Sequence, residues 1–398
     1  MTNEHRVAMG ATAELDHCPL MPTYAAPSVM FVAGDGSWLT DRDGTRYLDL
    51  LNGLAVTSLG HAHPVVAAAI AAQATKLLHV SNLYGNEHHG QLATTLDGLI
   101  GGGGQLFFTN SGAEANECAL KLARKFGGRG RHVVISAWGS FHGRTLATLH
   151  ATGQPTKHEA FQPLPEGFRH VVWNDIDSLR TALDPSVAAV LLEPVQGEGG
   201  VNPADIEYLR AVRDLCTERG VLLMMDEIQT GLGRTGEWFG FQHAGIQPDV
   251  VTVAKALGNG MPIGGCWAKR EIAACFEPGD HGTTYGGQPL AAAAARAVLD
   301  VMMSEDVPRR ARHAGKRFTD GLSALPAVLS VRGLGMLLAA ELDVDALGRD
   351  SRAVAAELMA RGVIVNAVTP TALRVAPSLL ISDDEIDHGL SILTEVLA

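Results

Sequence analysis

Short apolar runs alternate with longer amphipathic stretches through the middle of the chain. Largely hydrophobic runs of strand length occur at 105–110, 132–136, 187–192, 221–225 and 250–254. Runs this short, without polar alternation, are typical of strands buried on both faces. The stretch 111–126 instead has helical spacing, with an apolar stripe of Ala115, Cys118, Ala119, Leu122 and Phe126. This alternation predicts an α/β fold, with a mostly parallel sheet covered by helices on both faces.

The two ends of the chain carry a different pattern. Residues 34–50 hold the turn signals GDG and RDG between short β-type runs, which predicts a hairpin. Long helical segments begin at Gln288, short strands follow, and the last helix starts with Ser382 and Glu385 in capping-box spacing. We therefore expect a large domain at 61–290, and a smaller α+β domain assembled from 1–60 and 291–398.

Composition narrows the classes of function. The chain has 398 residues, 46% hydrophobic and 19% charged, as is ordinary for a soluble enzyme. A net charge of −12 without basic runs argues against nucleic-acid binding. We expect no membrane span and no signal peptide, because the N-terminus lacks an apolar core. Five cysteines without a CxxC pair suggest no disulfide framework, so we expect a cytoplasmic protein.

An amine and a carboxylate follow two of the predicted strands. Lys255 comes directly after the run 250–254, and Asp226 directly after the run 221–225. In an open parallel sheet, ligands bind at the carboxyl edge of the strands. We expect the two strands to be neighbours, and an amine and a carboxylate on neighbouring strand ends suit pyridoxal phosphate, whose aldehyde a lysine can bind covalently while an aspartate keeps its pyridine nitrogen protonated. Three alternatives remain: a strand-end lysine that reaches water, a cofactor-free Schiff-base lyase, and a nucleotide-binding or structural protein.

Other strand ends supply further candidate residues. Ser111, Gly112 and Ala113 lie between a strand and a helix, where backbone N–H groups could bind a phosphate; the alternative is an ordinary N-cap serine. Phe141 could stack on a planar cofactor, and Arg144 could bind a substrate carboxylate or simply be a surface arginine. The histidine pairs at 61 and 63 and at 88 and 89 lack zinc spacing, so we expect no metal site.

Several of these segments, in order, resemble one enzyme family. From Asp41 to Pro377 the chain contains LDLLNGLAVTSLGHAHP, FFTNSGAEANECALKLARK, FHGRTLATLHATGQP, EPVQGEGGV, DEIQTGLGRTG, AKALGNGMPIGG, HGTTYGG and VRGLG. Together they resemble the class III (subgroup II) pyridoxal-phosphate-dependent aminotransferases of fold type I. The chain departs from the usual family pattern at Gln288, where asparagine is common, and at Gly258-Asn259-Gly260, where three glycines are usual.

The resemblance implies a role for individual residues. Lys255 would bind the cofactor aldehyde and move the proton, and Asp226 would hold the pyridine nitrogen. Gln229 would bond the ring hydroxyl and Phe141 would stack on the ring. The phosphate would be bound by Ser111, Gly112 and Ala113, joined by Thr284 from the partner subunit of a homodimer with shared active sites. The residues implied on the substrate side are Arg144, Thr283, Asn82, Tyr24, Glu198 and Arg374.

The last two of these residues address a charge problem. Two different amino donors must use one pocket, so the charge of that pocket must suit both. Glu198 could neutralise Arg374 for one donor and move aside for the other. Within the family, the resemblance implies amino transfer from N-acetylornithine to 2-oxoglutarate in arginine biosynthesis. Ornithine, succinylornithine and 4-aminobutyrate are the alternative donors.

Overall fold

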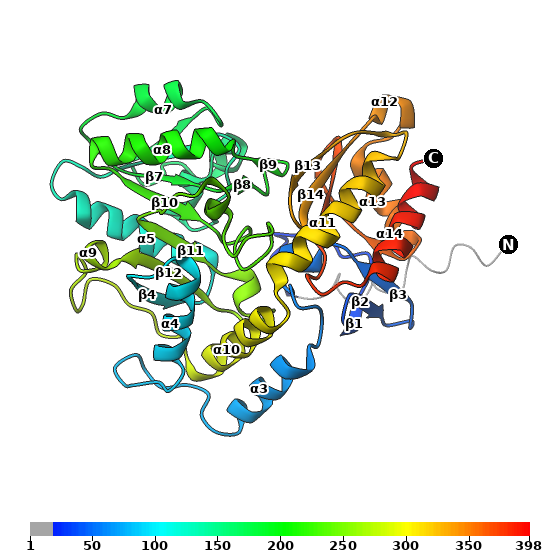
Figure 1. The fold of residues 1–398 in the computed structure, drawn as a ribbon, viewed down its shortest axis with the longest axis horizontal. Coiled ribbons are helices and arrows are strands. Elements are labelled where there is room, and N and C mark those ends of the chain that lie inside the picture. The colour runs from blue at the N-terminus through cyan, green and yellow to red at the C-terminus, as the bar shows by residue number, and fades with distance from the viewer. Residues whose placement is uncertain (1–18) are drawn as a thin grey trace.

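A seven-stranded sheet forms the core of the larger lobe of the molecule (Figure 1). The computed structural model describes residues 19–398. Our expectations for the first eighteen residues, including Cys18, lie outside the described residues. The strands follow the spatial order β4 (Gly104–Thr109), β12 (Gly264–Lys269), β11 (Val250–Val253), β10 (Leu222–Asp226), β7 (Val187–Leu192), β5 (Val133–Ala137) and β6 (Phe168–Val171).

The pairing within this sheet is mostly parallel, as predicted. Strands β11, β10, β7, β5 and β6 pair in parallel. The exception is β12, which runs antiparallel to both β11 and β4. The sequence pattern did not predict this strand, because its two opening glycines resemble the end of the preceding loop.

Both faces of the sheet are buried, and neighbouring residues along a strand belong to different apolar clusters. In β7, Val190 and Leu192 join one cluster, and Ala189 and Leu191 join the other. Helix α8 (Ile206–Arg219) packs into the first cluster and α5 (Gly112–Gly127) into the second. The strands therefore have no polar face, which explains why their sequences lack polar alternation.

Two smaller four-stranded sheets build the rest of the molecule. One has the order β1 (Phe31–Asp35), β2 (Trp38–Asp41), β3 (Arg46–Asp49) and β15 (Val363–Ile364). The other is antiparallel, with the order β13 (Val328–Leu334), β14 (Leu337–Leu342), β17 (Ala372–Val375) and β16 (Asn366–Thr369). Because β3 pairs in parallel with β15, the segment near the N-terminus joins the C-terminal part. This supports the proposed division at about residues 60 and 290, which stays a prediction.

Helices cover the sheets and join the two lobes (Figure 1). Helix α3 starts at Pro64, and the predicted capping box of Ser382 and Glu385 is present. The remaining helices are α2 (Asn52–Ala55), α3 (Pro64–Ala74), α4 (His89–Ile100), α6 (Leu146–Ala151), α7 (Ile176–Ala182), α9 (Arg270–Ala273), α10 (Pro289–Ser304), α11 (Val307–Ser323), α12 (Val344–Leu347), α13 (Ser351–Ala360) and α14 (Asp383–Val396).

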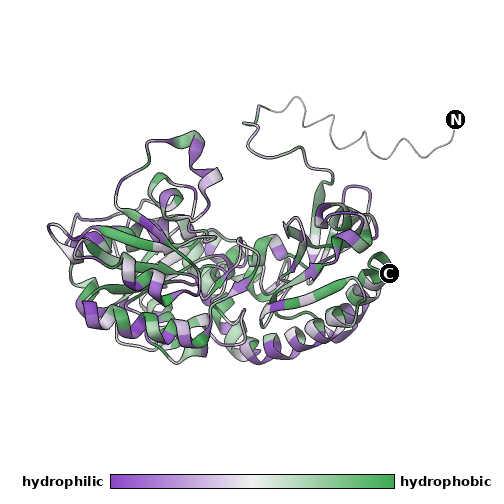
Figure 2. Ribbon diagram, turned by 90° about the horizontal axis from the view of Figure 1, so that it is seen from above, coloured by the Kyte–Doolittle hydropathy of each residue, from purple (hydrophilic) through white to green (hydrophobic). Residues whose placement is uncertain are grey.

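Hydropathy follows this layering. Figure 2 shows hydrophobic residues concentrated in the strands, and hydrophilic and hydrophobic stretches alternating along the helices. A short hairpin, β8 (Val195–Gln196) and β9 (Asn202–Pro203), lies beyond the end of β7. Among residues 19–398, no helix combines the length and the apolar character needed to cross a membrane.

Candidate active site

Lys255 and Asp226 lie at the carboxyl ends of two adjacent parallel strands. Asp226 is the last residue of β10, and it pairs with Thr252 of β11, three residues before Lys255. The predicted adjacency of the two strands is therefore confirmed. Both residues line one cavity of about 390 Å³. The remaining walls come from the loops after β4, β5 and β7, and from Gly260 to Ile263.

The backbone and side chain of Lys255 both carry signs of a special position. Its φ of 41° lies in the left-handed region, which costs a non-glycine residue about 1 to 2 kcal/mol. No side chain or carbonyl of residues 19–398 accepts a hydrogen bond from the Lys255 amine. Burial lowers the pKa of this amine below its usual value, although Glu198, Asp226 and Glu193 oppose the shift. A larger share of the amine is therefore uncharged and able to react with a carbonyl.

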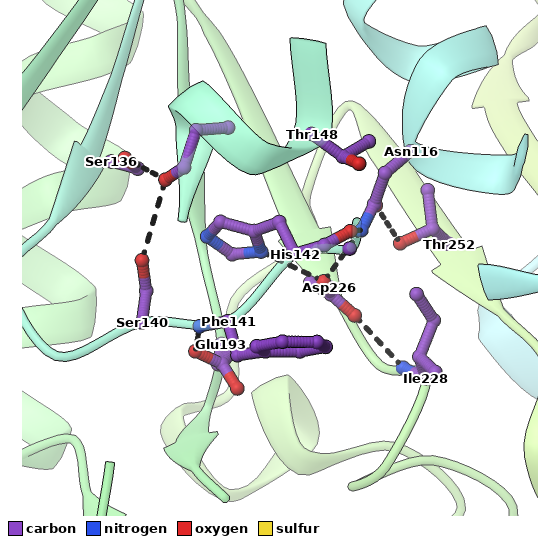
Figure 3. Close-up of polar contacts among 12 residues, drawn as sticks. Asn116, Ser136, Ser140, Phe141, His142, Thr148, Glu193, Asp226, Ile228 and Thr252 are labelled. Carbon is purple, nitrogen blue, oxygen red and sulfur yellow. Dashed lines mark hydrogen bonds and ion pairs between the residues drawn. The ribbon is translucent and has the colours of Figure 1, made fainter. Parts of the chain in front are cut away.

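Asp226 is held by hydrogen bonds on both carboxylate oxygens (Figure 3). Oδ2 accepts one from Nδ2 of Asn116 and one from Nδ1 of His142, each at 2.8 Å. Oδ1 accepts the backbone N–H of Ile228 at 3.1 Å. The side chain is only 4% exposed, so these donors replace the water that an ionised carboxylate would otherwise bind. The carboxylate is thus fixed as an acceptor at the cavity wall.

Sequence reasoning missed Asn116, His142 and Thr252. Asn116 is fully buried, and it links Asp226 to Thr252, whose hydroxyl donates to Oδ1 of Asn116 at 2.8 Å. The position of Asn116 in the sequence could have indicated its role. Residue 116 lies next to the apolar stripe of its helix, and a side-chain amide that is buried there needs hydrogen-bond partners. The partners themselves come from β11 and from the loop after β5, and sequence spacing does not bring these together.

The loop before α5 provides a helix N-terminus at the cavity. Ser111 is the N-cap of this helix, and its Oγ accepts the N–H of Glu114 at 3.2 Å. The expectation that Ser111 could be an ordinary N-cap residue is therefore confirmed. The first backbone N–H groups, including those of Gly112 and Ala113, lie where a helix attracts anions. A Cβ on Gly112 would approach Ile228 to 2.7 Å, which explains the glycine. Phosphate binding by this turn stays a prediction.

Phe141 forms another part of the wall. Its backbone N–H donates to Oε2 of Glu193 at 3.0 Å, which ties the loop after β5 to the end of β7. Burial raises the pKa of Glu193 well above its usual value, and the charge of Asp226 raises it further. The exposed guanidinium of Arg144 lies 5.6 Å from the centre of the Phe141 ring. The ring and the guanidinium therefore face the same cavity.

Glu198 and Arg374 form the ion pair that the resemblance implied. Nη1 of Arg374 donates to Oε1 of Glu198 at 2.5 Å. Burial raises the pKa of Glu198, but the charge and hydrogen bond of Arg374, together with Lys255 and Gln229, lower it by more, so the pKa lies below its usual value. The arginine is 1% exposed and the glutamate side chain 30%, so only the acid has room to move. Gln229 accepts a weaker bond from Nη1 of Arg374 at 3.4 Å.

Five predicted residues do not line this cavity, and one of them, Arg374, reaches its edge through the bond to Glu198. Thr283 contacts its edge, because Oγ1 accepts Nδ2 of Asn110, a lining residue, at 3.2 Å. Asn82 donates to the carbonyl of Thr283 at 3.1 Å. Thr284 is exposed, and Tyr24 is 91% exposed. The structure thus brings Thr283 and Asn82 near the site and leaves Thr284 and Tyr24 outside it.

The assembled side chains fit a planar aldehyde that carries a phosphate. An amine without a hydrogen-bond acceptor, a fixed carboxylate, a helix N-terminus and an aromatic ring all border the same cavity. For the histidines, the structure shows other partners, such as Asp49 for His61 and Gln73 for His88. Across residues 19–398, no group of three or more histidine, cysteine or acidic side chains is arranged to hold a metal ion.

Comparisons with known proteins agree with this geometry. Residues 22–397 match the family model described as aminotransferase class-III. Acetylornithine aminotransferase from Gloeobacter violaceus is 47% identical over 95% of this chain and 96% of its own. The crystal structure of N-acetylornithine aminotransferase from Stenotrophomonas maltophilia has a TM-score of 0.83 and 35% identity, covering 96% and 97% of the two chains. A PLP-bound amine transaminase from an uncultivated Pseudomonas species has a TM-score of 0.88 and 30% identity, covering 95% and 97%.

Proposed function

The chain belongs to the class-III aminotransferase family and has the fold type I architecture, and from this premise we propose that it transfers the amino group of N-acetylornithine to 2-oxoglutarate. The products are N-acetylglutamate 5-semialdehyde and glutamate, in arginine biosynthesis. The cofactor is pyridoxal phosphate, whose conjugated ring withdraws electrons from the substrate carbon that gives up its proton. The observation that carries the proposal is the Lys255 amine, which lies beside Asp226 in one cavity and has no hydrogen-bond acceptor among residues 19–398.

Lys255 serves as nucleophile and as proton carrier. Its lowered pKa favours the neutral amine, which bonds the cofactor aldehyde. Once the substrate has displaced Lys255 from the cofactor, Nζ of Lys255 takes the proton from the substrate carbon. It gives the proton back later in the amino transfer. The strained backbone at φ 41° directs this side chain from the strand end into the cavity.

Asp226 holds the pyridine nitrogen in its protonated form. At a separation of about 4 Å and an effective dielectric near 20, an opposite-charge pair gains roughly 4 kcal/mol before desolvation. Ser111, Gly112 and Ala113 bind the phosphate, Phe141 stacks on the ring, and Gln229 bonds the ring hydroxyl. The Cβ of any residue other than glycine at position 197 would overlap with Oε1 of Gln229, which supports a fixed place for that amide.

The substrate side is built from charged groups. Arg144 binds a substrate carboxylate at the cavity mouth. Glu198 neutralises Arg374 when N-acetylornithine is bound, and it moves aside when a second carboxylate needs that arginine. Thr283, Asn82 and Tyr24 contribute to the substrate side in this proposal. The contacts of Thr283 with Asn110 and Asn82 support the first two.

The enzyme acts as a homodimer with shared active sites in the cytoplasm. In this proposal Thr284 reaches the phosphate of the partner subunit, and its exposed position outside its own chain's cavity supports this. The free thiols of Cys118, Cys216, Cys266 and Cys275 suit a reducing compartment.

The absorption spectrum of the purified protein tests the cofactor chemistry. We expect a long-wavelength band from the bound cofactor, which borohydride and Lys255→Ala both remove. A cofactor-free Schiff-base lyase has no such band before substrate is added, so a protein without it, even after incubation with pyridoxal phosphate, contradicts the proposal.

A panel of amino donors tests the substrate. At fixed 2-oxoglutarate, N-acetylornithine should give a higher kcat/KM than N-succinylornithine, ornithine and 4-aminobutyrate. A higher kcat/KM with free ornithine contradicts the choice of donor and leaves the transaminase assignment in place.

A further inference from the structure

We propose that Thr252 is a positioning residue, whose hydroxyl helps to hold the Asn116 amide in the orientation that presents an N–H group to Asp226. This inference rests on the proposed function, in which Asp226 holds the pyridine nitrogen. It adds a residue from a neighbouring strand that touches neither cofactor nor substrate. Thr252 acts on the site only through Asn116.

The contacts form a chain from one strand to the other. The hydroxyl of Thr252 donates to Oδ1 of Asn116, and Nδ2 of Asn116 donates to Oδ2 of Asp226, both at 2.8 Å. The same Nδ2 also donates to the carbonyl of His142 at 2.8 Å. Figure 3 shows Thr252 and Asp226 on opposite sides of the Asn116 amide. All three side chains are at most 4% exposed, so water does not substitute for any of these bonds.

The surroundings of the amide allow one orientation. Rotating it by half a turn would place Oδ1 against two acceptors, the Asp226 carboxylate and the His142 carbonyl. Two donors would then meet at the other end, where the amide nitrogen would face the Thr252 hydroxyl. That hydroxyl could turn to accept, but the two acceptor–acceptor contacts would remain without a proton between them. Thr252 therefore adds to an existing preference and holds the amide in it.

The fold explains why the residue stands at this position. Thr252 pairs in register with Asp226 across β10 and β11, and Val250, two residues earlier, belongs to the cluster under α5. Side chains two residues apart on a strand share a face, so Thr252 points toward that helix. Asn116 lies on the buried side of the helix, between the two strand ends. A hydroxyl at this strand position reaches the amide, whereas a valine there would fill the same space without a donor.

With the Asn116 amide in this orientation, the Asp226 carboxylate accepts three hydrogen bonds. Oδ2 receives Nδ2 of Asn116 and Nδ1 of His142, and Oδ1 receives the N–H of Ile228. Within the part of the chain that the structure describes, Nε2 of His142 is buried without a hydrogen-bond partner, which places the ring proton on Nδ1, facing Asp226. These three donors hold the carboxylate in one orientation. If the Asn116 amide loses its orientation, Asp226 loses one of these donors. Its interaction with the pyridine nitrogen of the cofactor then becomes weaker.

The experiment compares isosteric and conservative substitutions in the holoenzyme. Thr252→Val keeps the shape and removes the hydroxyl, while Thr252→Ser keeps the hydroxyl. Ser351→Ala is the matched control, because it removes a buried hydroxyl that donates to the carbonyl of Thr369 outside the cavity. The measurements are the rate of cofactor loss from the holoenzyme, followed by its absorption band during dilution, and kcat and KM for the amino donor. If Thr252→Val does not fold, Thr252→Ala takes its place.

We expect Thr252→Val to lose cofactor roughly tenfold faster than wild type, the size expected for one bond to a charged group. Its kcat should fall with little change in KM. Thr252→Ser and Ser351→Ala should lose cofactor at a rate close to that of wild type. A wild-type rate in Thr252→Val, or equal damage in Thr252→Ser, overturns the inference. A wild-type protein without any cofactor band overturns the proposed function instead, so the two failures are distinguishable.

Discussion

The ion pair between Glu198 and Arg374 shows what a single residue contributes to specificity. The arginine is buried and makes a second strong contact, from Nη2 to Oδ1 of Asn366 at 2.8 Å, so its position is fixed. The acid is the movable member, because nearly a third of its side chain is exposed. An isolated buried guanidinium is costly, so the acid stabilises the pocket whenever no substrate carboxylate replaces it.

Replacing the acid by its amide tests this division of roles. In Glu198→Gln, Arg374 keeps its charge without a counter-charge while N-acetylornithine is bound. We expect kcat/KM for this donor to fall about tenfold, the loss of one charge-assisted hydrogen bond. The value for glutamate should change less, because its own carboxylate neutralises the arginine. Half-reaction kinetics with each donor measure both values, and equal losses for the two donors would contradict the switch.

Another acid, Glu227, is buried, and it makes the stability of the protein depend on pH. Burial raises the pKa of Glu227 to about 7, although its oxygens accept the hydroxyl of Thr230 and the N–H groups of Gly240 and Phe241. The folded protein therefore binds this proton more tightly than the unfolded chain does. The contribution of Glu227 to the free energy of unfolding is fully present at pH values below the ordinary pKa of a glutamate. It is lost as the pH rises through about 7.

Comparison with a variant that does not titrate isolates this effect. Glu227→Gln should be less stable at low pH, because its NH₂ group faces backbone donors. The difference between wild type and variant should shrink by about 3 kcal/mol between pH 4 and pH 9. Urea unfolding at fixed protein concentration across that range measures it. Parallel pH profiles for the two proteins would show that Glu227 does not titrate in the folded state.

At the scale of elements, α5 contributes to several parts of the site. Its N-terminus borders the cavity, its N-cap is Ser111, and its buried face carries Asn116. The helix is anchored by apolar packing against the sheet, so its first turn is held in place by residues that have no chemical role. Two interpretations of Ser111, as a cap and as a phosphate ligand, are both compatible with its position.

Substitution by another good N-cap residue separates these two interpretations. Aspartate caps helices about as well as serine, but its charge repels a phosphate. We expect Ser111→Asp to keep the stability of the cofactor-free protein within about 0.5 kcal/mol. Its affinity for pyridoxal phosphate should fall more than about tenfold. Thermal unfolding and a cofactor titration measure the two quantities. Unchanged affinity would leave Ser111 as a cap alone.

The strand β12 is an element that the hydrophobic pattern of the sequence did not predict. The parallel strands β5, β7, β10 and β11 were predicted, because each is a short apolar run before a polar loop. β12 begins with two glycines, and close packing requires one of them: a Cβ on Gly264 would lie 2.7 Å from Oγ1 of Thr109. The sequence therefore resembles a loop where the structure has a strand that begins with two residues without side chains.

At the scale of the whole molecule, one chain leaves part of the proposed site exposed. Thr284 and Tyr285 lie on the surface, on the loop that contacts Asn82 and Asn110. Leu83 and Tyr84, in the neighbouring loop, are 85% and 68% exposed. Exposed apolar residues beside a catalytic cavity fit a subunit interface, as the proposed homodimer requires.

Mixed dimers test whether the active sites are shared. Lys255→Ala removes the nucleophile, and Thr284→Glu places a negative charge where a phosphate should bind. If Thr284 serves the partner's site, a dimer of one Lys255→Ala subunit and one Thr284→Glu subunit contains one intact site and one doubly altered site. Refolding the two variants together should restore up to about a quarter of wild-type activity, whereas each variant alone stays nearly inactive. No recovery would place Thr284 in its own chain's site, and full activity of Thr284→Glu alone would place it outside both sites.

The sequence by itself determined the class of fold and the central pair of the site. Continuous apolar runs required strands buried on both faces, and Lys255 and Asp226 follow two of those runs, so their place at the carboxyl edge followed from chain order. Only the tertiary structure decided the register in which the strands and helix α5 pack, and therefore that Thr252 and Asn116 meet Asp226. The physical reason is that hydrophobic periodicity encodes burial, whereas a hydrogen bond between distant segments depends on the register in which they pack.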